Sequence, residues 1–266
     1  MKTKIFFLIF LFLPSGLLAG DITLFFQNGT EKVIKTDDQI IRFDNMNIVK
    51  ISGLENFKSI KSLSLRGNKI SEIGFLNSVN NIEKIDLSHN NINIITSLNI
   101  KGLKVLNLSY NRIRKIEGLD NLSNVIELNL QSNRLKKIEN LSHLTRLKSL
   151  NLIYNMIKKI EGLENLRLLY TLQLSSNKIT KIDGLKNCVE LSNLLLDRNR
   201  ITKIENINHL YKLINLSLIF NKIRKIENIN KLTQLRHLSL RNNRIRKKEG
   251  VEKLYNLQHF DLNYLM

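Results

Sequence analysis

The sequence predicts an α/β-type solenoid, in which short segments fold into similar turns that stack into one elongated domain. Three observations lead to this prediction: a period of 22 residues, a repeated pattern of apolar positions within it, and an asparagine at one fixed position of each period. A fixed period of roughly 20–50 residues is the sequence signature of a repeat architecture. The 266 residues therefore predict one array of turns rather than two compact globular domains.

The landmark asparagine recurs nine times, with a step of 22 residues that is broken once by 21. The nine are Asn68, Asn90, Asn111, Asn133, Asn155, Asn177, Asn199, Asn221 and Asn243. An amide side chain both donates and accepts hydrogen bonds, so it can bond backbone groups where the chain bends away from a strand. We expect these residues to form a structural ladder and not a binding surface.

Each turn is expected to contribute one short strand. Counted from the landmark asparagine as zero, apolar residues occupy offsets −8, −5, −3, +2, +5, +8 and +11. The residues at −5 and −3 alternate with polar ones, which places their side chains on the inner face of a strand. No single turn can bury its own leucines, so neighbouring turns must stack into a parallel sheet over a continuous core.

The repeated line resembles a known family. It continues with IEGL or IENL, as in Ile116-Glu117-Gly118-Leu119 and Ile138-Glu139-Asn140-Leu141. This pattern is similar to the 22-residue leucine-rich-repeat subclass shared by bacterial internalins and the leucine-rich regulatory subunit of protein phosphatase 1. The resemblance covers residues 41–266, with nine full turns between degenerate terminal turns. It implies a curved array with a parallel sheet on the concave side, extended or 3-10 segments on the convex side, and protein binding on the concave face.

Residues 1–20 predict a signal peptide. Lys2 and Lys4 form a basic start, an apolar run follows from residue 5 to 13, and Pro14 and the small residues up to Gly20 end the segment. The apolar run is shorter than the ~20 residues of a membrane-spanning helix. We expect export to the periplasm, the cell surface or the medium. Cleavage of the segment and its retention as an anchor both stay open.

The two ends of the array depart from the family. Residues 21–40 predict a β-hairpin cap, because two short apolar segments flank Asn28-Gly29, a strong hairpin signal. Met46 stands where the first turn should have its asparagine, which is typical of a terminal repeat. At the other end a strand is expected from Phe260, with Leu265 at the asparagine position and no cap. An uncovered parallel edge predicts self-association there.

Charge predicts a second kind of partner. The chain has 42 Lys and Arg against 23 Asp and Glu, a formal net charge of +19. Many basic residues fall at offsets +1, +3 and +4, and the lysine column includes Lys137, Lys159, Lys181 and Lys203. These lysines are candidates for binding a polyanion such as an anionic glycan or surface. The alternative is that these basic residues are simply solvated and form weak ion pairs with the acidic residues at offset +6. Nucleic acid is not expected, since no aromatic residues interleave with the basic columns.

The expected concave face, offsets −6, −4 and −2, is mostly small and polar. Against that background stand Ile153, Leu195 and Ile219, with Tyr154 and Phe220 beside them at offset −1. A cluster of apolar residues on a polar surface predicts a protein interface. Exposed apolar residues are also common in isolation, and this alternative stays open.

The sequence does not predict an enzyme, a metal site or a cofactor. Cys188 occupies a column held by leucine in other turns, so we expect a buried thiol rather than a nucleophile. His237, His259 and Asp261 share the expected concave face on consecutive turns and form a weak candidate for a divalent metal. The leading hypothesis is an exported, adhesion-like protein-binding module. The alternative is an intracellular regulatory subunit similar to the phosphatase-1 partner.

Overall fold

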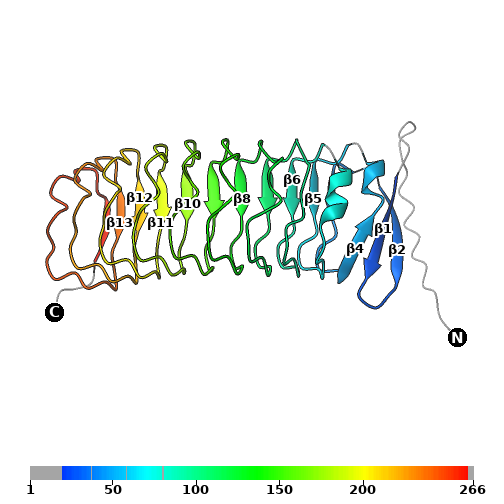
Figure 1. Cartoon of the computed structure of the whole chain (residues 1–266), viewed down its shortest axis with the longest axis horizontal. Helices are drawn as coiled ribbons and strands as arrows, with labels where there is room; N and C mark the ends of the chain where they lie inside the picture. Colours follow the sequence, from blue (N-terminus) through cyan, green and yellow to red (C-terminus); the bar gives the residue numbers. More distant parts are fainter. Residues whose placement is uncertain (1–19, 37, 58, 80, 263–266) are drawn as a thin grey trace.

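The computed structural model describes residues 20–36, 38–57, 59–79 and 81–262. Within them the chain forms an elongated stack of turns, with the short strands side by side along one face (Figure 1). Of the predicted signal peptide only Gly20, the first residue of a strand, is described. Leu265 also lies outside the described residues.

A small antiparallel sheet covers the first turn. Its order is β2-β1-β4, with β1 (Gly20–Phe26) in the centre, β2 (Glu31–Thr36) on one side and β4 (Ile48–Ser52) on the other. Asn28 and Gly29 lie in the loop between β1 and β2. Ile22 and Leu24 of β1 are fully buried, as are Ile48 and Ile51 of β4. The hairpin is thus joined by a strand from the first turn, a pairing that the repeat pattern does not predict.

The main sheet has eleven parallel strands, in the order β14-β13-β12-β11-β10-β9-β8-β7-β6-β5-β3. The strands are β3 (Ile40–Arg42), β5 (Ser62–Ser64), β6 (Lys84–Asp86), β7 (Val105–Asn107), β8 (Glu127–Asn129), β9 (Ser149–Asn151), β10 (Thr171–Gln173), β11 (Asn193–Leu195), β12 (Asn215–Ser217), β13 (His237–Ser239) and β14 (His259–Asp261). Strands consecutive in this series are neighbours in space, so one turn adds one strand. The predicted fold class is confirmed.

The core is a set of apolar columns that run along the stack. Leu172, in the middle of β10, pairs in register with Leu150 of β9 and Leu194 of β11, and all three are fully buried. The connections between strands are turns and extended segments, apart from two short 3-10 helices, η1 (Leu54–Asn56) and η2 (Gly74–Ser78). The described residues contain no α-helix.

The landmark asparagines bond the backbone of two turns at once. Asn177 Nδ2 donates to the carbonyl oxygens of Leu174 at 3.0 Å and Leu152 at 2.9 Å, and its Oδ1 accepts from the amide of Ile157 at 2.9 Å. Asn199 of the next turn also donates to Leu174, at 3.0 Å. Because one carbonyl serves two asparagines, the side chains form a continuous ladder along the stack.

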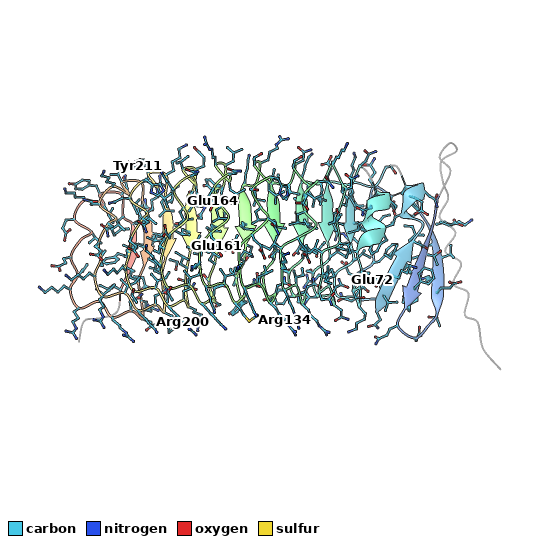
Figure 2. All side chains as sticks on the ribbon, in the orientation of Figure 1. Glu72, Arg134, Glu161, Glu164, Arg200 and Tyr211 are labelled. Atoms are coloured by element: carbon cyan, nitrogen blue, oxygen red, sulfur yellow. The ribbon has the colours of Figure 1, made fainter. Side chains whose placement is uncertain are left out.

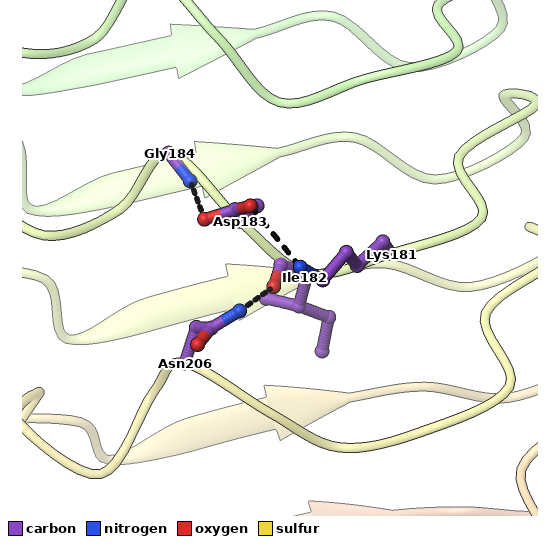
Figure 3. Close-up of polar contacts among 5 residues, drawn as sticks. All are labelled: Lys181, Ile182, Asp183, Gly184 and Asn206. Atoms are coloured by element: carbon purple, nitrogen blue, oxygen red, sulfur yellow. Dashed lines mark hydrogen bonds and ion pairs between the residues drawn. The ribbon is translucent and has the colours of Figure 1, made fainter.

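A second series of residues, at offset +7, explains the alternation of IEGL and IENL. Here the backbone has positive φ, which favours glycine or asparagine. Gly184 has φ +69, and a Cβ atom added to it would lie 2.2 Å from the carbonyl oxygen of Ile160. In the next turn Asn206 has φ 58 and donates to the carbonyl oxygen of Ile182 at 2.9 Å (Figure 3). Either residue therefore fits the close approach of two turns.

Candidate functional site

The sheet face, formed by the side chains at offsets −6, −4 and −2, is lined mainly by hydrogen-bonded polar groups. Asp197 Oδ1 accepts from the amide of Ile219 at 2.8 Å and from the hydroxyl of Ser217. Asn151 Nδ2 donates to Gln131 Oε1 at 3.1 Å. These bonds link one turn to the next, so they order the side chains of this face.

The rim column, formed by the residues at offset −1, borders the sheet face. Its described members from β6 onward all have positive φ, between 53° and 58°. They are His89, Tyr110, Ser132, Tyr154, Ser176, Arg198, Phe220 and Asn242. Left-handed backbone is unfavourable for bulky side chains. The side chains of Tyr154 and Phe220 in this column are 57% and 45% exposed, so they lie beside the sheet face rather than in the core.

The five residues predicted to bind a protein fall into two groups. Leu195, Ile219 and Phe220 lie on consecutive turns, because β11 pairs with β12. Ile153 and Tyr154 follow β9, and β10 separates them from the first group. Ile153, Leu195 and Ile219 are half-buried. The structure therefore places the residues on one face but puts a polar turn between the two groups.

Sequence reasoning missed an apolar patch on the flank that precedes the strands. This lateral patch consists of Leu168, Tyr170, Val189 and Tyr211, of which Tyr170 is 50% and Tyr211 56% exposed. Tyr170 of this patch also lines a groove of about 350 Å³, together with Ser192, Ile214 and the Glu190–Lys212 ion pair of 2.7 Å. Figure 2 shows Tyr211 at the upper edge of the molecule. The signal is in the sequence, since apolar residues occupy offsets that are mostly polar in other turns.

The four predicted polyanion-binding lysines are exposed on the basic flank, the side chains at offsets +1, +3 and +4. Of them Lys181 forms a salt bridge, to Asp183 at 3.4 Å (Figure 3). The Gly184 amide and then Lys181 lower the pKa of the Asp183 carboxyl. Arg134 and Arg200 of the same flank lie at the lower edge in Figure 2. Acidic neighbours thus pair with only a few of the basic side chains of the described flank.

The side chains of the weak metal candidate, His237, His259 and Asp261, do not point to a common centre. The rings of His237 and His259 stack at 4.8 Å between centroids with an angle of 9° between planes, so their in-plane lone pairs run parallel rather than converging. Asp261 Oδ1 instead lies 3.2 Å from Arg241 Nε. Among the described residues, no group of three His, Cys, Asp or Glu side chains is arranged to hold a metal.

Cys188 lies fully buried in the core column. Burial, and to a lesser extent the charge of Glu164, raise the pKa of its thiol to about 11. A thiol that stays protonated at neutral pH is a poor nucleophile.

No helix of the described part of the chain is long and apolar enough to span a membrane.

Comparison with known proteins identifies the repeat. The family described as "Leucine Rich repeats (2 copies)" matches residues 123–166 and 145–187. A search of curated proteins found no match. The functional domain of InlJ from Listeria monocytogenes is 25% identical, with a TM-score of 0.72 over 85% of this chain and 49% of that one. That domain includes a cysteine ladder, whereas this chain has one cysteine.

Two further structures share the fold. A leucine-rich-repeat protein of Leptospira interrogans is 26% identical, with a TM-score of 0.72 over 79% of this chain and 56% of that one. FLRT2, in an octameric complex with Latrophilin 3 and Unc5D, is 23% identical, with a TM-score of 0.64 over 75% of this chain and 74% of that one. The chain thus spans about half the length of the InlJ and Leptospira chains.

Proteins of this kind mediate protein–protein interaction, and no catalytic family is indicated. The matched repeats, the parallel sheet and the likeness to InlJ together show a leucine-rich-repeat solenoid that is similar to those of internalins.

Proposed function

We propose that the chain is an exported interaction module that binds a protein through its sheet face, while its basic flank attracts anionic surfaces. One observation carries the proposal. Leu195, Ile219 and Phe220, with Ile153 and Tyr154 on the far side of the polar β10 turn, present apolar surface on a face that is otherwise polar. An apolar centre inside a hydratable rim is the usual anatomy of a protein interface.

Two relatives support the proposal by analogy. InlJ and FLRT2 share the fold, and FLRT2 is part of a complex with other proteins. The basic start and short apolar run of residues 1–20 support export. The self-association predicted at the β14 edge stays a prediction, and residues 263–266 are not described.

Alanine variants in a pull-down from the native organism and its surroundings test the interface. The partner retained by the wild-type chain should be lost on Tyr154→Ala with Phe220→Ala, and retained on the matched control Tyr170→Ala with Tyr211→Ala. With that partner purified, each sheet-face variant should weaken binding about thirtyfold, or roughly 2 kcal/mol, because a few central aromatic residues carry most interface energy. Loss of binding only in the control pair would move the interface to the lateral patch.

Cell fractionation with mass spectrometry of the native protein tests export. The proposal expects a chain outside the cytoplasm that has lost residues 1–19 or 1–20. A full-length chain confined to the cytoplasm would support the intracellular regulatory alternative instead.

A further inference from the structure

The last full turn interrupts a core column. At offset +5 eight consecutive turns carry isoleucine, namely Ile73, Ile95, Ile116, Ile138, Ile160, Ile182, Ile204 and Ile226, and all eight are buried. The ninth turn has Lys248 at this offset, and its side chain is exposed. A lysine ammonium is costly to bury without a partner, so this turn does not close over the core as the others do.

A cleft lies beside this interruption. Its volume is about 800 Å³. Ile226 and the half-buried Ile245 lie between its charged walls. The walls carry five basic side chains from two neighbouring turns and one acidic one: Arg224, Lys225, Arg244, Arg246, Lys247 and Glu249. We call this feature the arginine cleft.

The charges of the arginine cleft are available to a ligand. Among the described residues, none of its five basic side chains takes part in a salt bridge. Glu249 offsets one of the five charges. Elsewhere on the described basic flank Lys115 and Lys181 are each paired to an acidic neighbour at 3.4 Å, and the other basic residues are unpaired as in the cleft, so the hollow and not the lack of pairing distinguishes it. The cleft therefore concentrates unpaired positive charge in a hollow, where electrostatic attraction is stronger than on an open face.

We propose that the arginine cleft binds the sulfate groups of an anionic polysaccharide. Guanidinium groups pair with sulfate or phosphate oxygens through two parallel hydrogen bonds, and three of the five cations are arginines. No aromatic side chain lines the cleft, so the bases of a single-stranded nucleic acid would find no stacking surface. These observations favour a sulfated glycan over a nucleic acid. The proposal rests on the proposed attraction to anionic surfaces and gives it a location.

The repeat supplies a matched control. Arg224, Lys225, Arg246 and Lys247 occupy offsets +3 and +4 of two adjacent turns. Lys136, Lys137, Lys158 and Lys159 occupy the same offsets of two other adjacent turns and do not line the cleft. Since Lys137 and Lys159 are among the predicted polyanion-binding lysines, this set tests the open flank against the cleft. Replacing either set of four with glutamine removes the same charge from the same side of the solenoid. Any difference between the two variants therefore reports the cleft and not the net charge.

Binding of heparin oligosaccharides to the full chain, measured at about 150 mM salt, tests the proposal. The cleft variant should weaken binding by about tenfold or more, and the control variant by about threefold or less, because the cleft has five basic side chains around one hollow. Desulfated heparin should bind at least tenfold more weakly than heparin. Circular dichroism should show that both variants fold, since all eight residues are exposed.

Three results would overturn the proposal. Equal losses in the two variants would show a general charge effect, and retained binding of desulfated heparin would show that sulfate is not recognised. Tighter binding of an oligodeoxythymidylate than of heparin would make nucleic acid the ligand. Absence of heparin binding by the wild-type chain would refute both the cleft proposal and the attraction to anionic surfaces. Binding of the protein partner through the sheet face would be unaffected, so the two failures are distinguishable.

Discussion

The guanidinium carbon of Arg198 lies 4.4 Å from the centre of the Phe220 ring, one turn along the rim column. A cation above an aromatic face is attracted by the ring, by about 0.5–1 kcal/mol at an exposed site. Arg198 thus helps to order an aromatic side chain that belongs to the proposed interface. Both residues sit on backbone of positive φ, 53° and 56°.

Substitution of Phe220 should separate the role of its ring from the strain of its backbone. Phe220→Gly and Phe220→Ala both remove the ring, but only glycine adopts positive φ without steric cost. We expect the glycine variant to be more stable than the alanine variant by roughly 1 kcal/mol in urea unfolding, the reverse of the usual order in a strand or helix. Both should bind the partner equally weakly. If the alanine variant were more stable than the glycine variant, the backbone at position 220 would not be strained.

Replacement of Asn177 should destabilise the stack from within. In Asn177→Ala the amide of Ile157 loses the side-chain acceptor 2.9 Å away, in a buried position. We expect a loss of about 3 kcal/mol in the free energy of unfolding, because the Ile157 amide is left without its acceptor and the bonds to the carbonyl oxygens of Leu152 and Leu174 are lost. The same change at exposed Asn93, which lies outside the ladder, should alter stability by less than about 0.5 kcal/mol.

Asn177→Asp refines this prediction. An ionised carboxylate can still accept from Ile157 but faces the carbonyl oxygens of Leu152 and Leu174. Relative to wild type, the variant should regain stability as the pH falls and the carboxyl takes up a proton, whereas Asn177→Ala should not. Similar pH dependence of the two variants would show that donation to the carbonyls is unimportant.

The thiol of Cys188 should react only when the core opens. Its pKa is raised from 9.0 to about 11, so the folded state favours the protonated form. This preference contributes stability that is fully present below pH 9 and is lost as the pH rises through about 11. The stability difference between wild type and Cys188→Ala should therefore shrink over that range. Fast alkylation of the folded protein at neutral pH would contradict the buried, protonated thiol.

The sequence predicts the repeated part of this fold well because one pattern is tested nine times. Leu172 and Asn177 are each explained by their offset alone. The pairing of β1 with β4 could not be read in the same way, because it joins the hairpin to a turn that lacks the landmark asparagine and has Met46 instead. A pairing that occurs once leaves no periodic signal.

Surface sites were predicted less completely, for a different reason. Ile153 and Phe220 can be recognised because they are apolar on a polar face. The pairing of β10 with β9 and β11 was needed to show that a polar turn lies between the two groups. The lateral patch around Tyr170 and the lysine at position 248 could both be recognised in the sequence, because each places an unusual residue type at its offset. A cleft, in contrast, depends on how far two turns separate, which residue types alone do not specify.

Because each turn adds one strand, the number of turns between two sites sets the distance between them along the solenoid. The sheet-face residues and the arginine cleft belong to the same stack, and each whole turn inserted between them would increase their separation by about 4.8 Å. A partner that engages both at once must match that length. Duplication or deletion of a 22-residue unit would thus change the spacing of two binding sites while leaving the chemistry of each intact.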